Sequence, residues 1–372
     1  MRLSRFVRNV IYIMAVLLLS YIGVLVCIQK ANQQEPVIYV KDTTGEFLPG
    51  MKIMIAKSPK EEEPVEEAPV CERPWEEPVV PIAAFSGELP RIICWGDSLT
   101  QSVDCKSAYP DVLEQLSQTT VINYGIMSET TTSIAMREGA VRVYAGECLI
   151  PEQCIPIELS VTSKSGKNVQ LLKYGQAGVN PCSIAGVTGN LVYIPETDTY
   201  QFTRSKPGEA VLVSEKTRIT TSAMYHKQQG DVLVIFTGTN DGLTPEKVEA
   251  LVKTQRAMLD YANCERYIII GMTCKKVMPE IERINELLSE EYGEHFLDIR
   301  TYMLQYGLGE AQITPTKEDE QDIRSGEIPG SLRKDYVHGN EHFYRILANQ
   351  VYRKLQYLGY LPVEEPDDEE RK

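Results

Sequence analysis

Three residues of this 372-residue chain have the types and spacing needed for covalent catalysis. The sequence GDSLT at 96–100 follows directly on the apolar run 92–95, and DYVH occupies 335–338. A serine at a strand end can act as a nucleophile, a histidine can take its proton, and an acid three residues earlier can orient the imidazole. These residues predict an enzyme in which Ser98, His338 and Asp335 form a triad.

A third polar segment, GTND at 238–241, follows the apolar run 232–236 and offers the side-chain amide of Asn240 at a second strand end. Each candidate also has a simpler interpretation. Ser98 could cap a helix, and Asn240 could be a turn residue. His342 could be the base instead, but it has no acid three residues before it, which favours His338.

The elements that must position these residues follow from the apolar pattern. Short apolar runs end at residues 95, 123, 236, 271 and 299, and helical periodicity occurs at 107–118, 245–262, 278–292 and 341–358. Strands that alternate with helices predict an α/β fold with a mostly parallel sheet covered on both faces. Ligands bind such sheets at the carboxyl ends of the strands. We therefore expect Ser98, the Gly125 loop and Asn240 to meet at one edge of the sheet.

The stretch 141–228 interrupts this alternation. It is rich in Thr, Val, Ser and Gly, with short alternating segments bounded by Gly and Pro. This pattern predicts a small antiparallel β insert. Its place in the chain, between the second and third strand-end segments, puts it near the rim of the site. It could hold an extended substrate or serve packing alone.

Residues 10–28 contain 19 residues without a charge, which is enough to cross a bilayer as a helix. Arg2, Arg5 and Arg8 precede this run, so the positive-inside rule predicts a cytoplasmic N-terminus and an external main domain. A cleaved signal peptide looks similar, but no small-x-small site follows the run. Residues 59–82 are dominated by Glu and Pro and predict an extended spacer.

Charge and cysteine content limit the functional classes. The net charge of −14 is concentrated at 61–78 and 361–372, and no Lys/Arg cluster interleaved with aromatics occurs, so no nucleic-acid partner is expected. Four histidines and the lack of a CxxC pair predict no metal site and no cofactor. An exported domain permits disulfides, for which Cys148 with Cys154, or Cys264 with Cys274, are candidate pairs.

With these segments in view, the chain resembles the SGNH (GDSL-type) hydrolase superfamily. Four motifs occur in the family's order: GDSL at 96–99, NYGIMSETT at 123–131, GTND at 238–241 and DYVHGN at 335–340. The resemblance covers 90–140 and 229–358. It departs at Ser128, where the family often has a second glycine, and at Gly339, where it often has proline.

The resemblance implies a three-layer, flavodoxin-like SGNH fold and assigns roles to the candidate residues. Ser98 is the expected nucleophile, with His338 as base and Asp335 as its partner. The backbone N–H groups of Ser98 and Gly125 and the amide of Asn240 are the expected oxyanion hole. Tyr109, Glu129 and Arg137 are further candidates for lining the pocket.

The predicted organisation has six parts: a cytoplasmic N-terminus at 1–9, a transmembrane signal anchor at 10–28, an extracellular stalk at 29–89, a hydrolase domain at 90–140 and 229–360, the β-rich insert at 141–228, and an acidic tail at 361–372. The expected function is an extracellular, single-pass membrane-anchored serine esterase that cuts carboxylic esters, acetyl esters in particular, on a cell-wall or other polysaccharide. One alternative is an O-acetyltransferase that uses the same acyl-serine. The other is a non-catalytic wall-binding protein on the same fold.

Overall fold

The central sheet has five strands in the order β14-β13-β12-β1-β2, and each neighbouring pair is parallel. Its strands are β1 (Ile92–Gly96), β2 (Val121–Gly125), β12 (Val232–Phe236), β13 (Tyr267–Ile270) and β14 (Phe296–Leu297). The structure, a computed structural model, describes residues 76–102, 105–273 and 278–363. Strands β1 and β12 are buried along their whole length, as expected for a parallel sheet covered on both faces.

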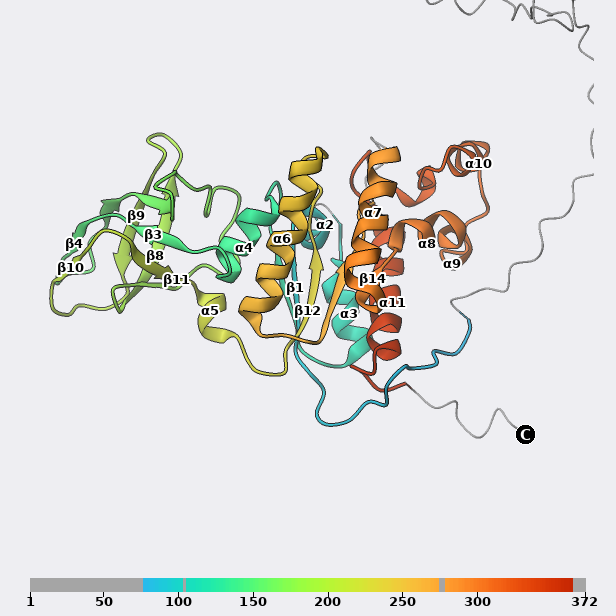
Figure 1. Ribbon diagram of the computed structural model, residues 1–372, viewed down its shortest axis with the longest axis horizontal. Helices are drawn as coiled ribbons and strands as arrows, with labels where there is room; N and C mark the ends of the chain where they lie inside the picture. The colour runs from blue at the N-terminus through green and yellow to red at the C-terminus, as the bar shows by residue number, and fades with distance from the viewer. Residues whose placement is uncertain (1–75, 103–104, 274–277, 364–372) are drawn as a thin grey trace, which may run out of the picture. The chain divides into compact units, whose positions relative to one another are not determined.

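Helices cover both faces of this sheet, which makes three layers (Figure 1). One face packs against α3 (Tyr109–Ser117) and α11 (Glu341–Tyr357), and the other against α4 (Thr131–Glu138), α6 (Pro245–Ala262) and α7 (Met278–Tyr292). Alternate residues of β1 enter the two cores: Ile92 and Cys94 join the first, whereas Ile93 and Trp95 join the second. Side chains of successive strand residues point to opposite faces, so one apolar run supplies both cores.

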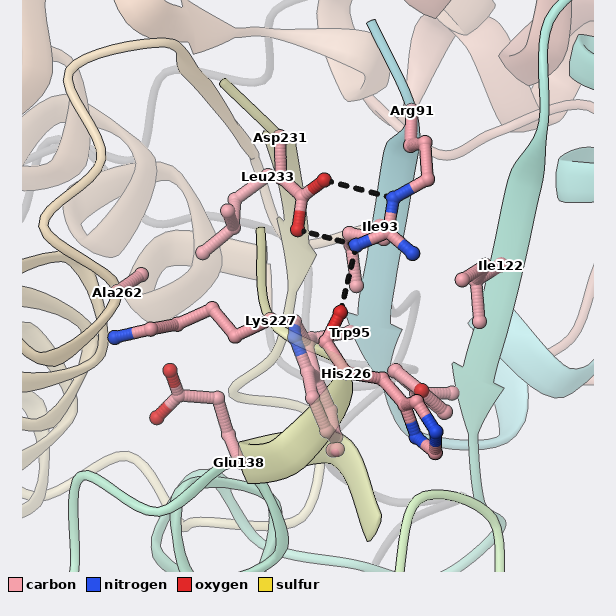
Figure 2. Close-up of a pocket in the computed structure, with 12 residues that line it drawn as sticks. Arg91, Ile93, Trp95, Ile122, Glu138, His226, Lys227, Asp231, Leu233 and Ala262 are labelled. Carbon is pink, nitrogen blue, oxygen red and sulfur yellow. Dashed lines mark hydrogen bonds and ion pairs between the residues drawn. The ribbon is translucent and has the colours of Figure 1, made fainter. Parts of the chain in front are cut away.

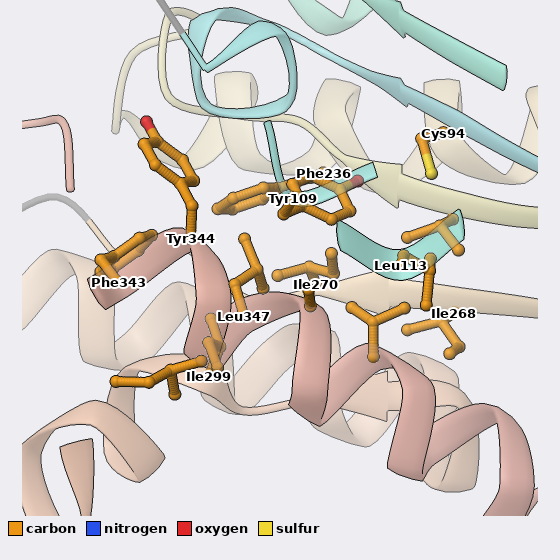
Figure 3. Close-up of a cluster of buried hydrophobic side chains, with 14 of the residues drawn as sticks. Cys94, Tyr109, Leu113, Phe236, Ile268, Ile270, Ile299, Phe343, Tyr344 and Leu347 are labelled. Atoms are coloured by element: carbon orange, nitrogen blue, oxygen red, sulfur yellow. The ribbon is translucent and has the colours of Figure 1, made fainter. Parts of the chain in front are cut away.

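Figure 3 shows the first core, in which aromatic rings of α3 and α11 meet the sheet. Tyr109, Phe343 and Tyr344 are each at most 2% exposed and pack against side chains such as Phe236 and Ile270. Aromatic side chains bury large areas and dominate such cores. The packing fixes the amino end of α11, which follows directly on the His338 segment.

Short helices fill the segment between β14 and α11. They are α8 (Ile299–Gln305), α9 (Gly307–Glu310), α10 (Lys317–Arg324) and the 3₁₀ turn η2 (Gly330–Leu332), and further short elements are α2 (Ser98–Gln101), α5 (Ser222–His226) and the 3₁₀ turn η1 (Gly293–His295). Side chains cap two of them at the amino end: Asp298 caps α8, and Thr316 caps α10. Caps satisfy the first backbone N–H groups of a helix, so these helices do not depend on a long apolar stripe.

The stretch 141–228 folds around its own core of buried side chains. Seven strands form one sheet in the order β5-β9-β8-β7-β11-β3-β6, β4 pairs with β10, and every pairing is antiparallel. The strands are β3 (Val143–Ala145), β4 (Cys148–Ile150), β5 (Ile157–Leu159), β6 (Val161–Ser163), β7 (Cys182–Ile184), β8 (Val187–Ile194), β9 (Thr199–Arg204), β10 (Val211–Val213) and β11 (Thr217–Thr220). In Figure 1 this insert, in green, joins the rest of the chain through α4 and α5.

Hydrogen bonds attach the insert to the α/β part of the chain, which contains the parallel sheet. The Thr221 hydroxyl donates to the carbonyl of Arg137 at 2.8 Å, and Val141 N–H donates to the carbonyl of Ala135 at 3.1 Å. Arg218 donates to the carbonyl of Gly139 at 3.0 Å. Both ends of the insert are therefore bound to α4 and to Gly139, the residue that follows it.

Several predictions fall outside the described residues. These are the membrane span at 10–28, the cytoplasmic segment at 1–9, the stalk as far as residue 75 and the tail from 364. Within 76–102, 105–273 and 278–363, no helix is long and apolar enough to span a bilayer.

The candidate pair Cys148 and Cys154 does not form a disulfide. Cys94, Cys105, Cys148, Cys154, Cys182 and Cys264 all form no disulfide. Cys264 donates from its thiol to the carbonyls of Asp231 and Arg266, and its proposed partner Cys274 lies outside the described residues. Only five residues lie between Cys148 and Cys154, but the folded chain decides whether two thiols face each other.

Candidate active site

Ser98 lies where β1 ends and α2 begins. Asp97 caps α2, accepting a hydrogen bond from Leu99 N–H at 3.0 Å, and Ser98 is the first helical residue. A side chain at Gly96 would overlap the Thr100 hydroxyl and the Phe236 carbonyl, so only glycine permits this tight turn. The turn leaves Ser98 8% exposed, at the carboxyl edge of the sheet.

His338 and Asp335 meet Ser98 in one chain of hydrogen bonds. The Nε2 atom of His338 lies 2.9 Å from Ser98 Oγ, and its Nδ1 lies 2.9 Å from Asp335 Oδ2. His342 lies within 3.4 Å of Arg345 on α11. The structure therefore brings His338, and not His342, to the serine.

The Asp335 carboxylate is held by its own loop. Its Oδ1 accepts N–H groups from Val337 and His338, each at 2.7 Å. Partial burial raises the pKa of Asp335, but these N–H groups and the His338 side chain outweigh that effect and lower it to about 2. Asp335 is thus ionised at neutral pH and can stabilise a positive imidazole.

Asn340 holds the carboxyl end of the loop that carries Asp335 and His338. Asn340 caps α11 by accepting N–H groups from His342 and Phe343, and it donates from its side chain to the Ser331 carbonyl at 2.7 Å. Because Asn340 follows His338 by two residues, the cap sets the register of the histidine relative to α11.

Gly125 does not provide the expected oxyanion donor. Its N–H already donates to Asn123 Oδ1 at 2.8 Å. A side chain at Gly125 would overlap the backbone of Thr100 and Gln101. Glycine is required there because β2 passes close to α2, which is a packing reason and not a catalytic one.

Ser128, three residues later, is better placed to donate. It is exposed and has a φ of 61°, a left-handed conformation that glycine adopts more easily than other residues. Among the described residues, no acceptor is bound to the N–H of Ser128 or of Ser98. The family's frequent glycine at this position was the sequence signal that pointed to Ser128.

Asn240 is bound to the same loop. Its amide donates to the Glu129 carbonyl at 3.0 Å, while Asp241 accepts from the backbone N–H and the hydroxyl of Thr131. An amide nitrogen carries two hydrogens, so a second N–H of Asn240 remains for a ligand. Strands β12 and β2 flank β1, and these bonds therefore join the loops on either side of Ser98.

Glu129, Arg137 and Tyr109, the predicted pocket-lining residues, are buried side chains. Their exposed fractions are 1%, 0% and 0%. Glu129 and Arg137 form an ion pair at 2.6 Å. Burial raises the pKa of Glu129 and lowers that of Arg137, and each partner opposes the shift of the other.

Asp97 is also buried, at 1% exposed. Burial raises its pKa to about 7, although the Leu99 N–H acts in the opposite direction. Asp97 is the helix cap beneath the serine, and the structure gives it no contact with His338 Nδ1, which Asp335 occupies.

A small cavity lies at the opposite end of the sheet. It has a volume of about 30 Å³ and lies at the amino ends of β1 and β12, where Arg91 forms an ion pair with Asp231 at 2.8 Å (Figure 2). Glu138, His226 and Lys227 line its other side. Ligands of parallel sheets bind at the opposite, carboxyl ends, so this cavity is not the expected substrate site. No group of three or more potential metal ligands occurs within the described ranges.

Comparison with known proteins found low-identity structural neighbours. No family model and no curated protein matches the chain. A member of the lipolytic protein G-D-S-L family from Veillonella parvula DSM 2008 is 15% identical, with 70% of this chain and 95% of that chain covered and a TM-score of 0.36. A lipase/acylhydrolase from Enterococcus faecalis is 14% identical, with 74% and 100% covered and a TM-score of 0.37.

A third neighbour, AlinE4, is an SGNH-hydrolase family esterase that is 15% identical, with 64% of this chain and 93% of that chain covered and a TM-score of 0.29. The scores are low, so the case for chemistry in this chain rests on the geometry described above.

Proposed function

We propose that this protein is a serine hydrolase of carboxylic esters. The observation that carries the proposal is the chain of hydrogen bonds from Ser98 Oγ through His338 to Asp335, with both links at 2.9 Å. A hydroxyl bonded to an imidazole that is itself oriented by an ionised carboxylate is the arrangement that activates a serine nucleophile.

In the first half of the reaction, His338 Nε2 accepts the hydroxyl proton as Ser98 Oγ attacks the ester carbonyl carbon. The carbonyl oxygen becomes an oxyanion, which the N–H groups of Ser98 and Ser128 and the free N–H of Asn240 stabilise. When the C–O bond of the ester breaks, the imidazolium gives its proton to the leaving alcohol. Asp335 stays ionised and holds Nδ1–H in place.

In the second half, water replaces the alcohol. His338 takes a proton from the water, hydroxide adds to the acyl carbon, and the second tetrahedral intermediate releases the acid and returns the proton to Ser98 Oγ. If a sugar hydroxyl replaced the water, the same acyl-serine would perform acetyl transfer.

We further propose that the substrate is an acetyl ester on a polysaccharide outside the cell. The uncharged run 10–28 and the Glu/Pro-rich spacer in the sequence support an external location. The β insert beside α4 supports an extended substrate. O-acetylated polysaccharides and p-nitrophenyl esters of two, four and eight carbons would be compared, with and without a sugar acceptor. Preference for the acetyl ester and release of free acetate are expected.

The triad is tested with Ser98→Ala. We expect hydrolysis of p-nitrophenyl acetate to fall by about 10⁴-fold or more and reaction with a fluorophosphonate probe to disappear. The thermal unfolding midpoint should stay near the wild-type value, because only one hydroxyl is removed. Unchanged turnover in a folded Ser98→Ala protein would contradict the assignment.

A further inference from the structure

Arg137 lies at the centre of a buried contact set beside the proposed site. Its guanidinium donates to Glu129 Oε2 at 2.8 Å, to the Tyr124 carbonyl at 2.9 Å and to the Ala177 carbonyl at 2.8 Å. It also lies 5.2 Å from the centre of the Trp95 ring. A fully buried arginine with three such partners holds its neighbours in one fixed geometry.

Glu129 is the partner that reaches the proposed oxyanion hole. It follows Ser128 directly, and its carbonyl accepts the Asn240 amide at 3.0 Å. Two residues later, Thr131 is bound to Asp241. The side chain of Glu129 therefore anchors the loop from which Ser128 donates and to which Asn240 is bound.

Ala177 is the partner that belongs to the insert. The insert loop at 171–179 lies against the α/β part: a side chain at Gly175 would come within 3.1 Å of Ile126, and one at Gly178 within 3.3 Å of Trp95 and Tyr124. The insert thus supplies one of the acceptors of Arg137 and packs against the first residue after β2.

We propose that Arg137 is a positioning residue for the oxyanion hole, and that the insert loop at 171–179 completes its binding site. This proposal rests on the proposed esterase function. Arg137 fixes the position of the Glu129 side chain. Glu129 in turn fixes the position of the Ser128 N–H and of the Asn240 amide. The Ala177 carbonyl of the insert binds the guanidinium from the other side. The loop at 171–179, but not the rest of the insert, would then be part of the catalytic apparatus.

The oxyanion forms only in the transition state, so misplaced donors lower kcat and leave KM little changed. For Arg137→Met we expect kcat for p-nitrophenyl acetate to fall by about 100-fold, with KM within about threefold of wild type. Arg137→Lys keeps the charge but lacks the planar fork of donors, so its kcat should lie between those of wild type and Arg137→Met.

Arg204→Met is the matched control. Arg204 is also a buried arginine, at 8% exposed, and it donates to the carbonyls of Pro151, Lys206, Gly208 and Glu209 inside the insert. Its loss should destabilise the insert and leave kcat of the folded fraction unchanged. An equal fall of kcat in both variants would overturn the proposal, since it would reflect general destabilisation.

The role of the insert loop is tested by alanine substitution at two glycines that have similar backbone conformations. Gly178 has a φ of 78°, and an added Cβ there would lie 3.3 Å from Ala223, Trp95 and Tyr124. Gly186 has a φ of 81°, and an added Cβ there would meet no atom within 4 Å. Both substitutions to alanine impose the same backbone strain. Gly178→Ala should lower kcat, and Gly186→Ala should not. Equal kcat in the two variants would contradict the role of the insert loop.

Two further measurements keep the proposal testable. If Arg137→Met does not fold, the neutral pair Glu129→Gln/Arg137→Gln replaces it, with the same expected loss of kcat. Hydrogen exchange of the 126–133 backbone should be faster in the Arg137 variant than in Arg204→Met, and equal exchange would overturn the positioning role. Wild-type protein that neither cleaves esters nor reacts with fluorophosphonate would instead refute the proposed function.

Discussion

Asp335 divides its two carboxylate oxygens between different partners. Oδ1 accepts two backbone N–H groups of its own loop, and Oδ2 faces the imidazole of His338. The spacing of three residues makes this possible, because the acid can bind the backbone N–H of the histidine that it orients. One carboxylate therefore shapes the loop and fixes the tautomer of the proposed base.

Asp335→Asn separates these two tasks. The Asn oxygen can still accept the two N–H groups, but its amide nitrogen would face His338 Nδ1 and favour the tautomer that has a proton on Nε2. That tautomer cannot accept the proton of Ser98. We expect kcat/KM for p-nitrophenyl acetate to fall by about 10⁴-fold, with a wild-type thermal midpoint because Asp335 is half exposed. A loss below tenfold would contradict the triad geometry.

At the scale of elements, α10 and the η2 turn are connected by one buried carboxylate. Asp319 accepts the Thr316 N–H at 2.9 Å as part of the α10 cap, and it accepts the Ser331 N–H at 2.8 Å from η2. Burial raises its pKa, but these N–H groups and the hydroxyls of Thr316 and Ser331 outweigh that effect and lower it to about 2. The bonds thereby fix the start of the segment that leads to Asp335.

Asp319→Asn should lower the free energy of unfolding at pH 7 by about 2 kcal/mol. The native pKa lies below the ordinary value of 3.8, so the ionised carboxylate stabilises the fold above about pH 4, and this stabilisation is lost as the pH falls toward 2. Urea unfolding at pH 7, 4 and 2.5 measures the effect. The difference between the two proteins should shrink with acid, and a constant difference would refute the linkage.

Glu138, at the end of α4, has a raised pKa, in contrast to the lowered pKa of Asp319. It is 5% exposed and lines the cavity of Figure 2, and burial raises its pKa from 4.5 to about 8 against the opposing effects of the Ala140 N–H and Lys227. The folded protein therefore retains a proton that the unfolded chain releases above about pH 4.5. Stability should fall as the pH rises from about 4.5 to about 8.

Glu138→Gln removes this pH dependence. The amide oxygen can still accept the Ala140 N–H, which Glu138 binds at 3.0 Å, and it carries no charge to bury. We expect the variant to unfold at a higher temperature than wild type at pH 8.5 and at a similar temperature at pH 4.5. Parallel midpoint curves over this range would show that the Glu138 carboxylate is not the cause.

At the scale of the whole molecule, two cores that differ in pattern meet at α4 and α5. The α/β part buries a parallel sheet between helices, and the insert buries antiparallel strands around its own core. Arg137 and Thr221 bind across the join. The two parts therefore share buried polar contacts, whose loss is more damaging than that of surface pairs.

The cysteines of the insert show whether a disulfide within it contributes to its stability. Cys148 and Cys154 carry free thiols, so the insert depends on its core and not on a covalent link. After denaturation without a reductant, iodoacetamide should modify both residues, as peptide mass spectrometry would detect. A linked pair of peptides containing Cys148 and Cys154 would contradict the structure.

Much of the architecture could be predicted from local pattern. The helical stretches at 245–262 and 278–292 correspond to α6 and α7, and the apolar runs correspond to the strands of the parallel sheet. Long periodic segments are predictable because burial of one face repeats at a fixed interval. Helices α8 to α10 were missed because they are short and depend on caps and on contacts with neighbouring elements.

The sequence by itself determined the alternation of strands and helices and the candidates Ser98, Asn240, Asp335 and His338, because these depend on residue type, period and short spacing. Only the tertiary structure decided which donors are free. One N–H of Asn240 is bound by the Glu129 carbonyl, 111 residues away, and Arg137 is bound by the Ala177 carbonyl, 40 residues away. Many groups along a chain can form the same hydrogen bond, and the packing of distant segments selects the partner.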